Sequence, residues 1–305
     1  MNEPAVAVFH RTTPGNRLVT WVAATRPAFL TASVLPVLVG LAFAWSTGQV
    51  FHPWLAALTV INIVFIHSGA NVLNDYFDAL NGTDAANARR LFPFTGGSRF
   101  IQNGVLTVGE TGRFGALLMA VGAALGLLMV VQTGPLLLVI GVLGGLLGII
   151  YSGPPCLACR GLGDLAIGVA FGVLPVVGTV YIQTGTLESP AAWLGAVVGF
   201  FVAAILWINS IPDIEADQQA GKRTLPVRLG PELSRFGVPL LFLAGFLTLV
   251  IAPVPPACRI GLLAALPAAA AVWNLHHGRI ISAIPLTLLT QTALCLLLAV
   301  GCIVG

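Results

Sequence analysis

Charged residues are scarce in this sequence. Lys, Arg, Asp and Glu together make up 8% of its 305 residues, whereas 57% are hydrophobic. Soluble globular domains carry about 25% charged residues, so this composition excludes an ordinary soluble domain. The net charge of +3 is too small to indicate a nucleic-acid partner, and we expect none. Residues 1–24 lack the charged-then-apolar pattern of a cleavable signal peptide, so we expect no such segment.

Cysteine and nucleotide-binding signals are also sparse. The chain has five Cys, and Cys156-Leu-Ala-Cys159 is its single C-x-x-C. Because no second pair or His accompanies it, we interpret it as a plain loop rather than a zinc or redox site. The segment Thr95-Gly-Gly-Ser98-Arg99 can form a backbone anion nest. It lacks the Lys and the spacing of a P-loop, which argues against nucleotide binding.

Long apolar runs are what the sequence has in abundance. Runs of about 17–25 apolar residues are typical of transmembrane helices. The sequence therefore predicts an all-α, multi-pass membrane protein in which residues 1–305 form a single membrane-embedded domain. Nine helices are predicted, over residues 25–47, 54–76, 114–132, 135–151, 163–183, 191–211, 237–253, 258–275 and 284–304.

The distribution of basic residues predicts how these helices are oriented. If nine helices alternate from a cytoplasmic N-terminus, only Arg259 falls on the opposite side, an excess that follows the positive-inside rule. We therefore predict a protein of the cell inner or plasma membrane, with its C-terminus on the side opposite the cytoplasm. The cytoplasmic residues would be Arg11, Arg17, Arg26, Arg89, Arg90, Arg99, Arg113, Arg160, Lys222, Arg223, Arg228, Arg235 and Arg279.

Six of the eleven acidic residues gather in two segments, each at the end of an apolar run. The first segment is Asn71-Val-Leu-Asn74-Asp75-Tyr-Phe-Asp78, with Asp84 soon after it. The second is Asn209-Ser-Ile-Pro-Asp213-Ile-Glu215-Ala-Asp217. On a helix, Asn71, Asp75 and Asp78 share one face, and we expect the same of Asn209, Asp213 and Asp217. Ionisable groups at membrane depth are costly and indicate a functional site.

Oxygen-only clusters of this kind suit a hard cation such as Mg²⁺, which usually brings a phosphorylated ligand with it. A ligand with an apolar tail and a diphosphate head would suit both the bilayer and two Mg²⁺ ions held by the two segments. Lys222, the only Lys, and Arg223 follow the second segment and would help to neutralise the diphosphate. Arg89, Arg90 and Arg99 follow the first segment. If the tail is allylic, departure of the diphosphate leaves a carbocation that an apolar cavity protects from water.

Connections at the cytoplasmic side add further candidates. We predict a cytoplasmic tail over residues 1–20 and two long loops, 77–113 and 212–236, each beginning with an acidic segment; long loops usually carry function. The connection from Tyr151 to Asp164 offers Tyr151, Ser152 and Arg160 to an anion, although a plain turn explains it equally well. Arg26 fits either a diphosphate ligand or an interfacial anchor. His67 is interpreted as a core or cavity-lining residue.

Two other functions compete with that of a Mg²⁺-dependent prenyltransferase. A divalent-cation channel or transporter would use the carboxylates as a selectivity site, but it needs a polar path across the membrane, and few polar residues lie on the far side. A phosphatidyl-group transferase would need an Asp-Gly…Ala-Arg…Gly…Asp…Asp run on adjacent helices, which the sequence lacks.

The two acidic segments and the residues around them resemble the corresponding motifs of the UbiA superfamily of intramembrane aromatic prenyltransferases. The resemblance extends from Arg26-Pro27 to the last helix and is most specific at Asn71-x-x-Asn-Asp75-Tyr-x-Asp78 and at Asp213-x-x-x-Asp217 with Gly221-Lys-Arg-Thr-Leu after it. It implies nine helices around a central cavity that two cytoplasmic loops cap, and a site with two Mg²⁺ ions. It assigns metal and diphosphate binding to Asn71, Asp75, Asp78, Asp213 and Asp217, diphosphate binding to Lys222 and Arg223, and a place beside the acceptor to Asp84. With the candidates above, the substrate-binding set is Arg26, Asn71, Asn74, Arg99, Tyr151, Arg160, Asn209, Lys222 and Arg223.

Within the superfamily, the chain looks most like the 1,4-dihydroxy-2-naphthoate prenyltransferases of menaquinone synthesis. That likeness is carried by Asp78-Ala-Leu-Asn-Gly82-Thr-Asp84, by Tyr151-Ser-Gly-Pro-Pro with Arg160-Gly-Leu-Gly, and by Gly178-Thr-x-Tyr181-x-x-Thr-Gly185. It implies prenylation at the carboxyl-bearing carbon with loss of CO₂. The segment Leu91–Ser98 and the pair Pro154-Pro155 depart from common family forms. The acceptor is therefore one of naphthoate, hydroxybenzoate, homogentisate, a porphyrin-like ring and a glycerol phosphate. The sequence does not determine the length of the prenyl chain or the oligomeric state.

Overall fold

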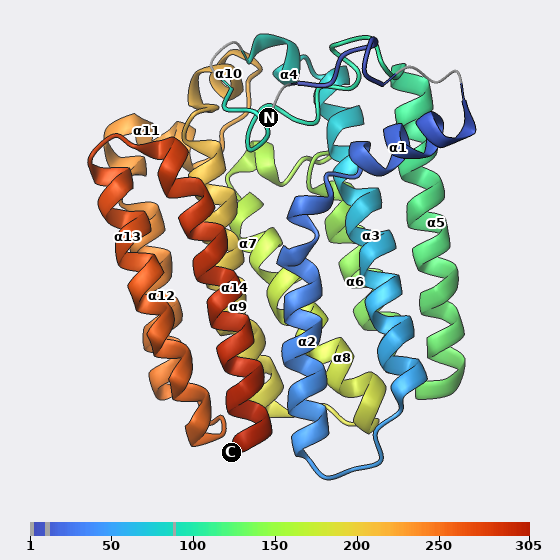
Figure 1. Cartoon of the computed structure of the whole chain (residues 1–305), viewed down its shortest axis with the longest axis vertical. Helices are drawn as coiled ribbons and strands as arrows, with labels where there is room; N and C mark the ends of the chain where they lie inside the picture. Colours follow the sequence, from blue (N-terminus) through green and yellow to red (C-terminus); the bar gives the residue numbers. More distant parts are fainter. Residues whose placement is uncertain (1–2, 10–12, 88–89) are drawn as a thin grey trace.

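The computed structural model describes residues 3–9, 13–87 and 90–305. Two basic residues used above, Arg11 and Arg89, lie outside the described residues. Every regular element within that range is helical, so the prediction of an all-α fold is confirmed. The long helices run side by side, with α4, α10 and α11 at one end of the bundle and the C-terminus at the other (Figure 1).

The helices follow the predicted apolar runs closely. The first part of the chain forms α1 (Pro14–Ala24), η1 (Pro27–Phe29), α2 (Thr31–Ser46), α3 (Pro53–Leu80), α4 (Thr83–Ala86), α5 (Val108–Thr133), α6 (Leu136–Ile150) and η2 (Ala158–Arg160). The second part forms α7 (Gly163–Gly168), η3 (Val169–Val173), α8 (Leu174–Thr184), α9 (Ser189–Ser210), α10 (Ile214–Gln219), α11 (Leu225–Ser234), α12 (Gly237–Ile251), η4 (Pro256–Ala264), α13 (Ala265–His276) and α14 (Ile280–Val304).

The number of membrane spans is only partly settled. Seven helical stretches of the described chain are long and apolar enough to cross a membrane, and they correspond to seven of the nine predicted helices. The other two are apolar helices of 15 residues, α6 and α12. Since α11 and α12 together form a further candidate span, bent by 99°, the described residues give seven or eight spans, and nine stays a prediction.

Glycines allow the helices around the site to pack closely. An added Cβ at Gly115 of α5 would lie 2.9 Å from the Leu73 side chain of α3, and one at Gly122 would lie 2.5 Å from Ile66. Small residues at such crossings are typical of membrane helices, because van der Waals packing rather than the hydrophobic effect joins helices in lipid. This packing fixes α3, the helix that carries the first acidic segment.

The main apolar core surrounds α9, the helix that leads into the second acidic segment. Leu194, Phe201 and Ile208 are fully buried in a cluster shared with α2, α12 and α14. At the end of α9, the Trp207 indole donates a hydrogen bond to the Ser234 carbonyl at 2.8 Å, which ties α9 to α11. Both acidic segments are therefore attached to rigid, well-packed helices.

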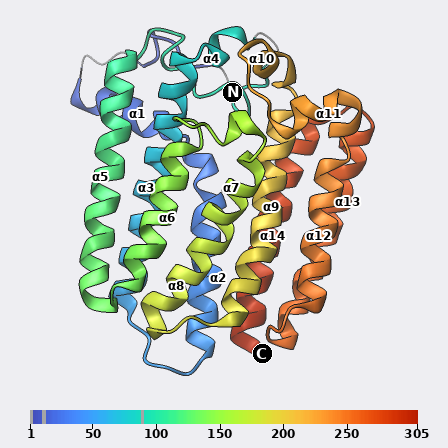
Figure 2. The same ribbon diagram turned by 180° about the vertical axis from the view of Figure 1, so that it is seen from behind.

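The predicted tail and loops are more ordered than the sequence indicated. Residues 14–20 of the predicted tail belong to α1, which continues to Ala24 and whose Trp21 packs on Phe114 with ring centroids 4.5 Å apart. The first long connection begins only after Leu80, because α3 continues through the first acidic segment. The second contains α10 and α11. Helices α4 and α10 contact each other and cover the same end of the bundle (Figure 1, Figure 2).

Candidate active site

The two acidic segments line one cavity at the end of the bundle beneath α4 and α10. Its charged and amide residues come from both segments and from the connections between helices. They are Arg26, Asn71, Asn74, Asp78, Asp84, Asn87, Asn209, Asp213, Asp217 and Lys222. The remaining wall is mostly apolar and includes Ala32, Ala170, Phe171, Val202, Ile205 and Leu206. The expectation that the segments share a cavity agrees with this geometry.

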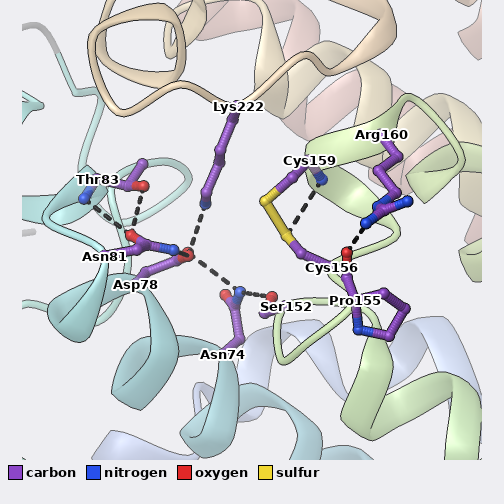
Figure 3. Close-up of a disulfide and its surroundings, with 10 residues drawn as sticks. All are labelled: Asn74, Asp78, Asn81, Thr83, Ser152, Pro155, Cys156, Cys159, Arg160 and Lys222. Carbon is purple, nitrogen blue, oxygen red and sulfur yellow. Dashed lines mark hydrogen bonds and ion pairs between the residues drawn. A yellow bond between two sulfur atoms is a disulfide. The ribbon is translucent and has the colours of Figure 1, made fainter.

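Asp78 joins the first acidic segment to Lys222, which follows the second segment. The Lys222 ammonium donates to Asp78 Oδ1 at 2.6 Å, and Asn74 Nδ2 donates to Asp78 Oδ2 at 3.1 Å. Asn74 Nδ2 also lies 2.6 Å from Ser152 Oγ, so the connection after α6 joins the same network (Figure 3). Asn81 adds a bond to Oδ1 at 3.3 Å. The Asp78 carboxylate is thus held by α3, by the connection after α6 and by the connection after α10.

Asp75 lies deeper than its neighbours and is outside the cavity lining. Its two carboxylate oxygens accept hydrogen bonds from the Ser98 N–H at 3.2 and 3.3 Å. The adjacent Gly97 has φ of +74°, and an added Cβ there would lie 2.5 Å from Asp84 Oδ2 and 3.1 Å from Asp75 Oδ1. The glycine-rich segment therefore packs its backbone against two carboxylates, and its Ser98 N–H bonds to one of them.

Asp84 is almost fully buried between the two acidic segments. Gln102 Nε2 donates to Asp84 Oδ2 at 3.2 Å, and the buried Arg99 guanidinium bonds to the Asp84 carbonyl. Burial raises the pKa of Asp84 to about 8, and the nearby Asp75 and Asp78 carboxylates act in the same direction. Arg99 supports the backbone of Asp84 and does not itself line the cavity.

The second segment does not form one continuous helical face, which corrects the expectation for Asn209, Asp213 and Asp217. Helix α9 ends at Ser210 and α10 begins at Ile214, because Pro212 cannot donate a helical hydrogen bond and restricts the residue before it. Asp213 instead stands at the start of α10, where Asn87 Nδ2 donates to its Oδ1 at 2.7 Å. All three residues still line the cavity.

Burial controls the ionisation of this second segment. It raises the pKa of Asp213, although hydrogen bonds from Asn87, Thr95 and Gly96 act against it. It raises the pKa of Asp217 to about 7, despite the opposing charge of Lys222. For Lys222 itself, burial disfavours the charge, but Asp78 and Asp217 outweigh it and raise the pKa. The charged form of Lys222 is therefore stabilised by its carboxylate neighbours, whereas burial disfavours the charged forms of Asp213 and Asp217.

The connection after α6 holds an unexpected covalent link. Cys156 and Cys159 form a disulfide, with Cα atoms 5.2 Å apart, where the sequence indicated a plain loop. The Cys159 carbonyl accepts a hydrogen bond from the Arg223 N–H at 2.9 Å, and the Lys222 N–H donates to the Asp217 carbonyl at 2.8 Å. The disulfide loop thus supports the backbone from which Lys222 reaches Asp78 (Figure 3).

Some predicted ligands are brought to the cavity and others are not. Arg26 lines it, stacks over the Phe29 ring at 4.6 Å and donates to the Phe94 carbonyl at 3.5 Å. Tyr151 also lines it, and burial raises the pKa of its hydroxyl. Arg160 and Arg223 are exposed and lie outside the cavity lining; Arg160 Nε donates to the Pro155 carbonyl at 2.9 Å instead.

Asn87 is a site residue that sequence reasoning missed. It is 2% exposed, lines the cavity and positions Asp213, yet its own Oδ1 has no hydrogen-bond partner within the described residues. It belongs to neither acidic segment, so spacing gave no signal for it. Only the contact between α4 and α10 brings it to the second segment.

The donor set fits Mg²⁺. The cavity supplies carboxylate and amide oxygens, and two of these, Asn87 Oδ1 and Asn209 Oδ1, are buried without a partner in the part of the chain that the structure describes. Among those residues, no three His, Cys, Asp or Glu side chains form a ready-made metal cluster. Mg²⁺ takes oxygen ligands and is usually bound by one or two carboxylates together with substrate phosphates.

Comparison with known proteins identifies the family. The sequence profile of the UbiA prenyltransferase family matches residues 33–285, and the chain belongs to this family of integral membrane prenyltransferases. The 1,4-dihydroxy-2-naphthoate octaprenyltransferase of Mycobacterium tuberculosis is 31% identical over 264 residues, which cover 85% of this chain and 87% of that protein. The Escherichia coli protein of the same name is 33% identical over 222 residues, or 70% of each chain.

Solved structures show the same fold. A UbiA homologue from Archaeoglobus fulgidus, bound to DMAPP and Mg²⁺, has a TM-score of 0.64 at 17% identity and covers 93% of this chain and 99% of its own. The apo structure of a UbiA homologue from Aeropyrum pernix K1 has a TM-score of 0.65 at 18% identity, covering 89% of this chain and 97% of its own.

Proposed function

We propose that this protein transfers a polyprenyl group from polyprenyl diphosphate to 1,4-dihydroxy-2-naphthoate, with loss of CO₂, in a Mg²⁺-dependent step of menaquinone synthesis. The observation that carries the proposal is the single cavity in which both acidic segments and Lys222 meet and which continues into an apolar wall. Its polar end suits a diphosphate, and its apolar end suits an isoprenoid chain. The naphthoate acceptor is supported by the names of the curated relatives.

The metal and diphosphate ligands would come from both segments. Asn71, Asp78, Asn209, Asp213 and Asp217 supply oxygens to the cavity, and Asp75 lies directly behind them. When bound, Mg²⁺ would neutralise the diphosphate and stabilise it as a leaving group. We expect two ions, one for each segment, because the two sets of oxygens lie on different helices.

Lys222 and Arg26 are the cations available to the diphosphate itself. Lys222 already lies against Asp78, and a diphosphate would give its ammonium a second anionic partner. Arg26 faces the cavity from the end of the N-terminal segment, where its guanidinium is held over Phe29. These two residues would orient the diphosphate so that its carbon–oxygen bond points toward the apolar wall.

The apolar wall would exclude water from the reaction. Val202, Ile205 and Leu206 of α9 face the cavity opposite Ala32, so a carbocation formed there would meet hydrocarbon rather than water. The ring carbon that bears the carboxyl group of the acceptor forms the new carbon–carbon bond. The allylic carbon–oxygen bond breaks, diphosphate leaves, and the carboxyl group leaves as CO₂.

Asp84 would orient the aromatic acceptor or accept a proton from it. Its carboxyl group lines the cavity, and burial raises the pKa of that group to about 8 in the metal-free protein. Such a group can accept a hydrogen bond or a proton from an acceptor hydroxyl. The hydrogen bond from Gln102 and the close packing of Gly97 hold its carboxyl group in place.

Several features of the cellular setting belong to the same proposal. We infer that the protein lies in the cell inner or plasma membrane, with its N-terminus in the cytoplasm and its C-terminus on the opposite side. The acidic segments and most basic residues then face the cytoplasm, where phosphorylated metabolites are found. The placement of α14's end opposite α4 and α10 supports this arrangement (Figure 1).

Product analysis tests the proposal. Purified protein in lipid nanodiscs is incubated with Mg²⁺, farnesyl or geranylgeranyl diphosphate and each of three acceptors: 1,4-dihydroxy-2-naphthoate, 4-hydroxybenzoate and homogentisate. We expect a prenylated naphthoquinol that has lost CO₂, and no product when EDTA replaces Mg²⁺. A product with only another acceptor would overturn the naphthoate assignment, and turnover in EDTA would overturn the role of Mg²⁺.

A further inference from the structure

His67 is a polar group on the cavity wall to which the proposed reaction assigns no role. It lies on α3 four residues before Asn71, so the two share a helical face and stand about 6 Å apart along the helix axis. Its side chain lines the cavity although the residue is only 6% exposed. His67 is therefore one helical turn further into the membrane than the first acidic segment.

The imidazole ring of His67 is fixed on two sides. The fully buried Ser33 places its Oγ 2.8 Å from His67 Nδ1, and Ser33 is itself bonded to the Leu30 carbonyl at 3.0 Å. The Phe171 ring packs against the imidazole with centroids 4.5 Å apart. Phe171 belongs to η3, a single π-helical segment between α7 and α8, and such segments are frequent at functional sites.

One nitrogen of this fixed ring is available to a ligand. Nδ1 is engaged by Ser33, whereas Nε2 has no hydrogen-bond partner within the described residues. Because the Ser33 hydroxyl donates its single proton to the Leu30 carbonyl, it accepts a hydrogen bond from His67 Nδ1–H. In a neutral imidazole with the proton on Nδ1, Nε2 is the acceptor, so it can accept a hydrogen bond from a ligand hydroxyl.

The position of His67 selects among the ligands of the proposed reaction. The diphosphate is matched by the carboxylates and Lys222 at the polar end, and the prenyl chain has no polar atom for Nε2. The aromatic acceptor carries hydroxyl groups, and its reacting carbon must lie beside the carbon that bears the diphosphate. We propose that His67, held by Ser33, binds a hydroxyl group of the aromatic acceptor through Nε2. This inference rests on the proposed prenyl transfer to an aromatic ring.

Two amide substitutions separate the roles of the two nitrogens. In His67→Gln the amide nitrogen or oxygen occupies the place of Nε2, and in His67→Asn it occupies the place of Nδ1. We expect His67→Asn to raise the KM for the acceptor about tenfold and leave the KM for the prenyl diphosphate within about twofold. His67→Gln should restore most of the acceptor KM. His276→Asn, which changes an exposed His on α13, is the matched control.

Methyl ethers of the acceptor hydroxyls test the contact directly. For one methyl ether, the KM of wild-type protein should rise about as much as the KM for the free acceptor rises in His67→Asn. The KM of His67→Asn for that same ether should be little higher than its KM for the free acceptor. Equal effects of His67→Asn on both substrates, or additive losses from the variant and the ether, would overturn the proposal.

The acceptor panel keeps this test distinct from that of the proposed function. If wild-type protein prenylates only another phenolic acceptor, the naphthoate assignment fails and His67 is tested with the acceptor that reacts. If no phenolic acceptor reacts while prenyl diphosphate still binds, both proposals fail. If His67→Asn keeps the wild-type KM for a reacting acceptor, the role of His67 alone fails.

Discussion

The Lys222 ammonium lies 2.6 Å from Asp78 Oδ1, although 144 residues separate the two in sequence. Both side chains are largely buried, at 9% and 12% exposure, and both line the cavity. The pair joins the connection after α10 to the end of α3. It therefore ties the placement of a carboxylate that is a candidate metal ligand to the connection after α10.

Replacing Lys222 by Met should both destabilise the protein and stop the reaction. Removing one partner of a buried pair leaves the other charge unpaired and costs about 3 kcal/mol or more. The double variant Asp78→Leu with Lys222→Met should recover much of the stability, because no charge is then stranded, but it should stay inactive. Thermal unfolding in detergent and product formation measure the two effects. Full activity of Lys222→Met would show that the pair is only structural.

Gly97→Ala should impair the site more than its backbone strain explains. Gly97 and Gly104 have nearly the same φ, +74° and +71°, so Ala costs each about 1 kcal/mol or more of backbone strain. Only at Gly97 does the new Cβ meet the Asp84 carboxyl, whereas it meets nothing within 4 Å at Gly104. We expect Gly97→Ala to lose more unfolding temperature than Gly104→Ala, and a loss of kcat/KM confined to Gly97→Ala. Equal activities of the two variants would contradict the close packing at Asp84.

The metal-free protein should lose stability as the pH rises. The pKa of Asp84 is raised to about 8 by burial and by Asp75 and Asp78, whereas an Asp in an unfolded chain has a pKa of about 3.9. Between these values the native state holds a proton that the unfolded state has lost, so its stability falls from about pH 4 to about pH 8. Asp84→Asn removes this contribution. Unfolding temperatures in EDTA should therefore depend less on pH in Asp84→Asn, and an unchanged dependence would place the titration elsewhere.

Opening the Cys156–Cys159 disulfide should weaken the reaction without abolishing it. The Cys159 carbonyl accepts from the Arg223 N–H, next to Lys222, so a looser loop would hold Lys222 less firmly. We expect dithiothreitol to raise the KM of wild-type protein for prenyl diphosphate a few-fold. The variant Cys156→Ser with Cys159→Ser should show the raised KM with and without dithiothreitol. The buried Cys295→Ser is the control, and a response of the double variant to dithiothreitol would place the effect at other thiols.

Much of the fold and part of the candidate site could be predicted from the sequence. Apolar run length located the helices, because lipid requires each span to satisfy its own backbone hydrogen bonds. The spacing of Asn71, Asp75 and Asp78 gave their helix correctly, although the burial of Asp75 behind Ser98 depends on a loop that folds back over it. Helices α6 and α12 are each 15 residues long, so their crossing of the membrane stays a prediction.

Other features depend on tertiary contacts that spacing does not reveal. Pro212 breaks the helical face expected through Asn209, Asp213 and Asp217. The two acidic segments have similar spacing, and that spacing alone predicts a continuous helix although Pro212 favours a break. Asn87 reaches Asp213 only because α4 packs on α10. The exposed positions of Arg160 and Arg223 show that a basic residue near a site in sequence does not necessarily point into it.

Binding of farnesyl thiolodiphosphate, a slowly reacting analogue, most directly tests whether the two acidic segments hold one diphosphate through Mg²⁺. Titration calorimetry compares wild-type protein, Asp78→Asn, Asp213→Asn and the double variant, with Mg²⁺ and with EDTA. We expect Mg²⁺-dependent binding that weakens about tenfold in each single variant. The double variant should bind little more weakly than either one, because the two residues act on the same ligand. Binding that is independent of Mg²⁺, or that only one of the two substitutions affects, would contradict a shared site.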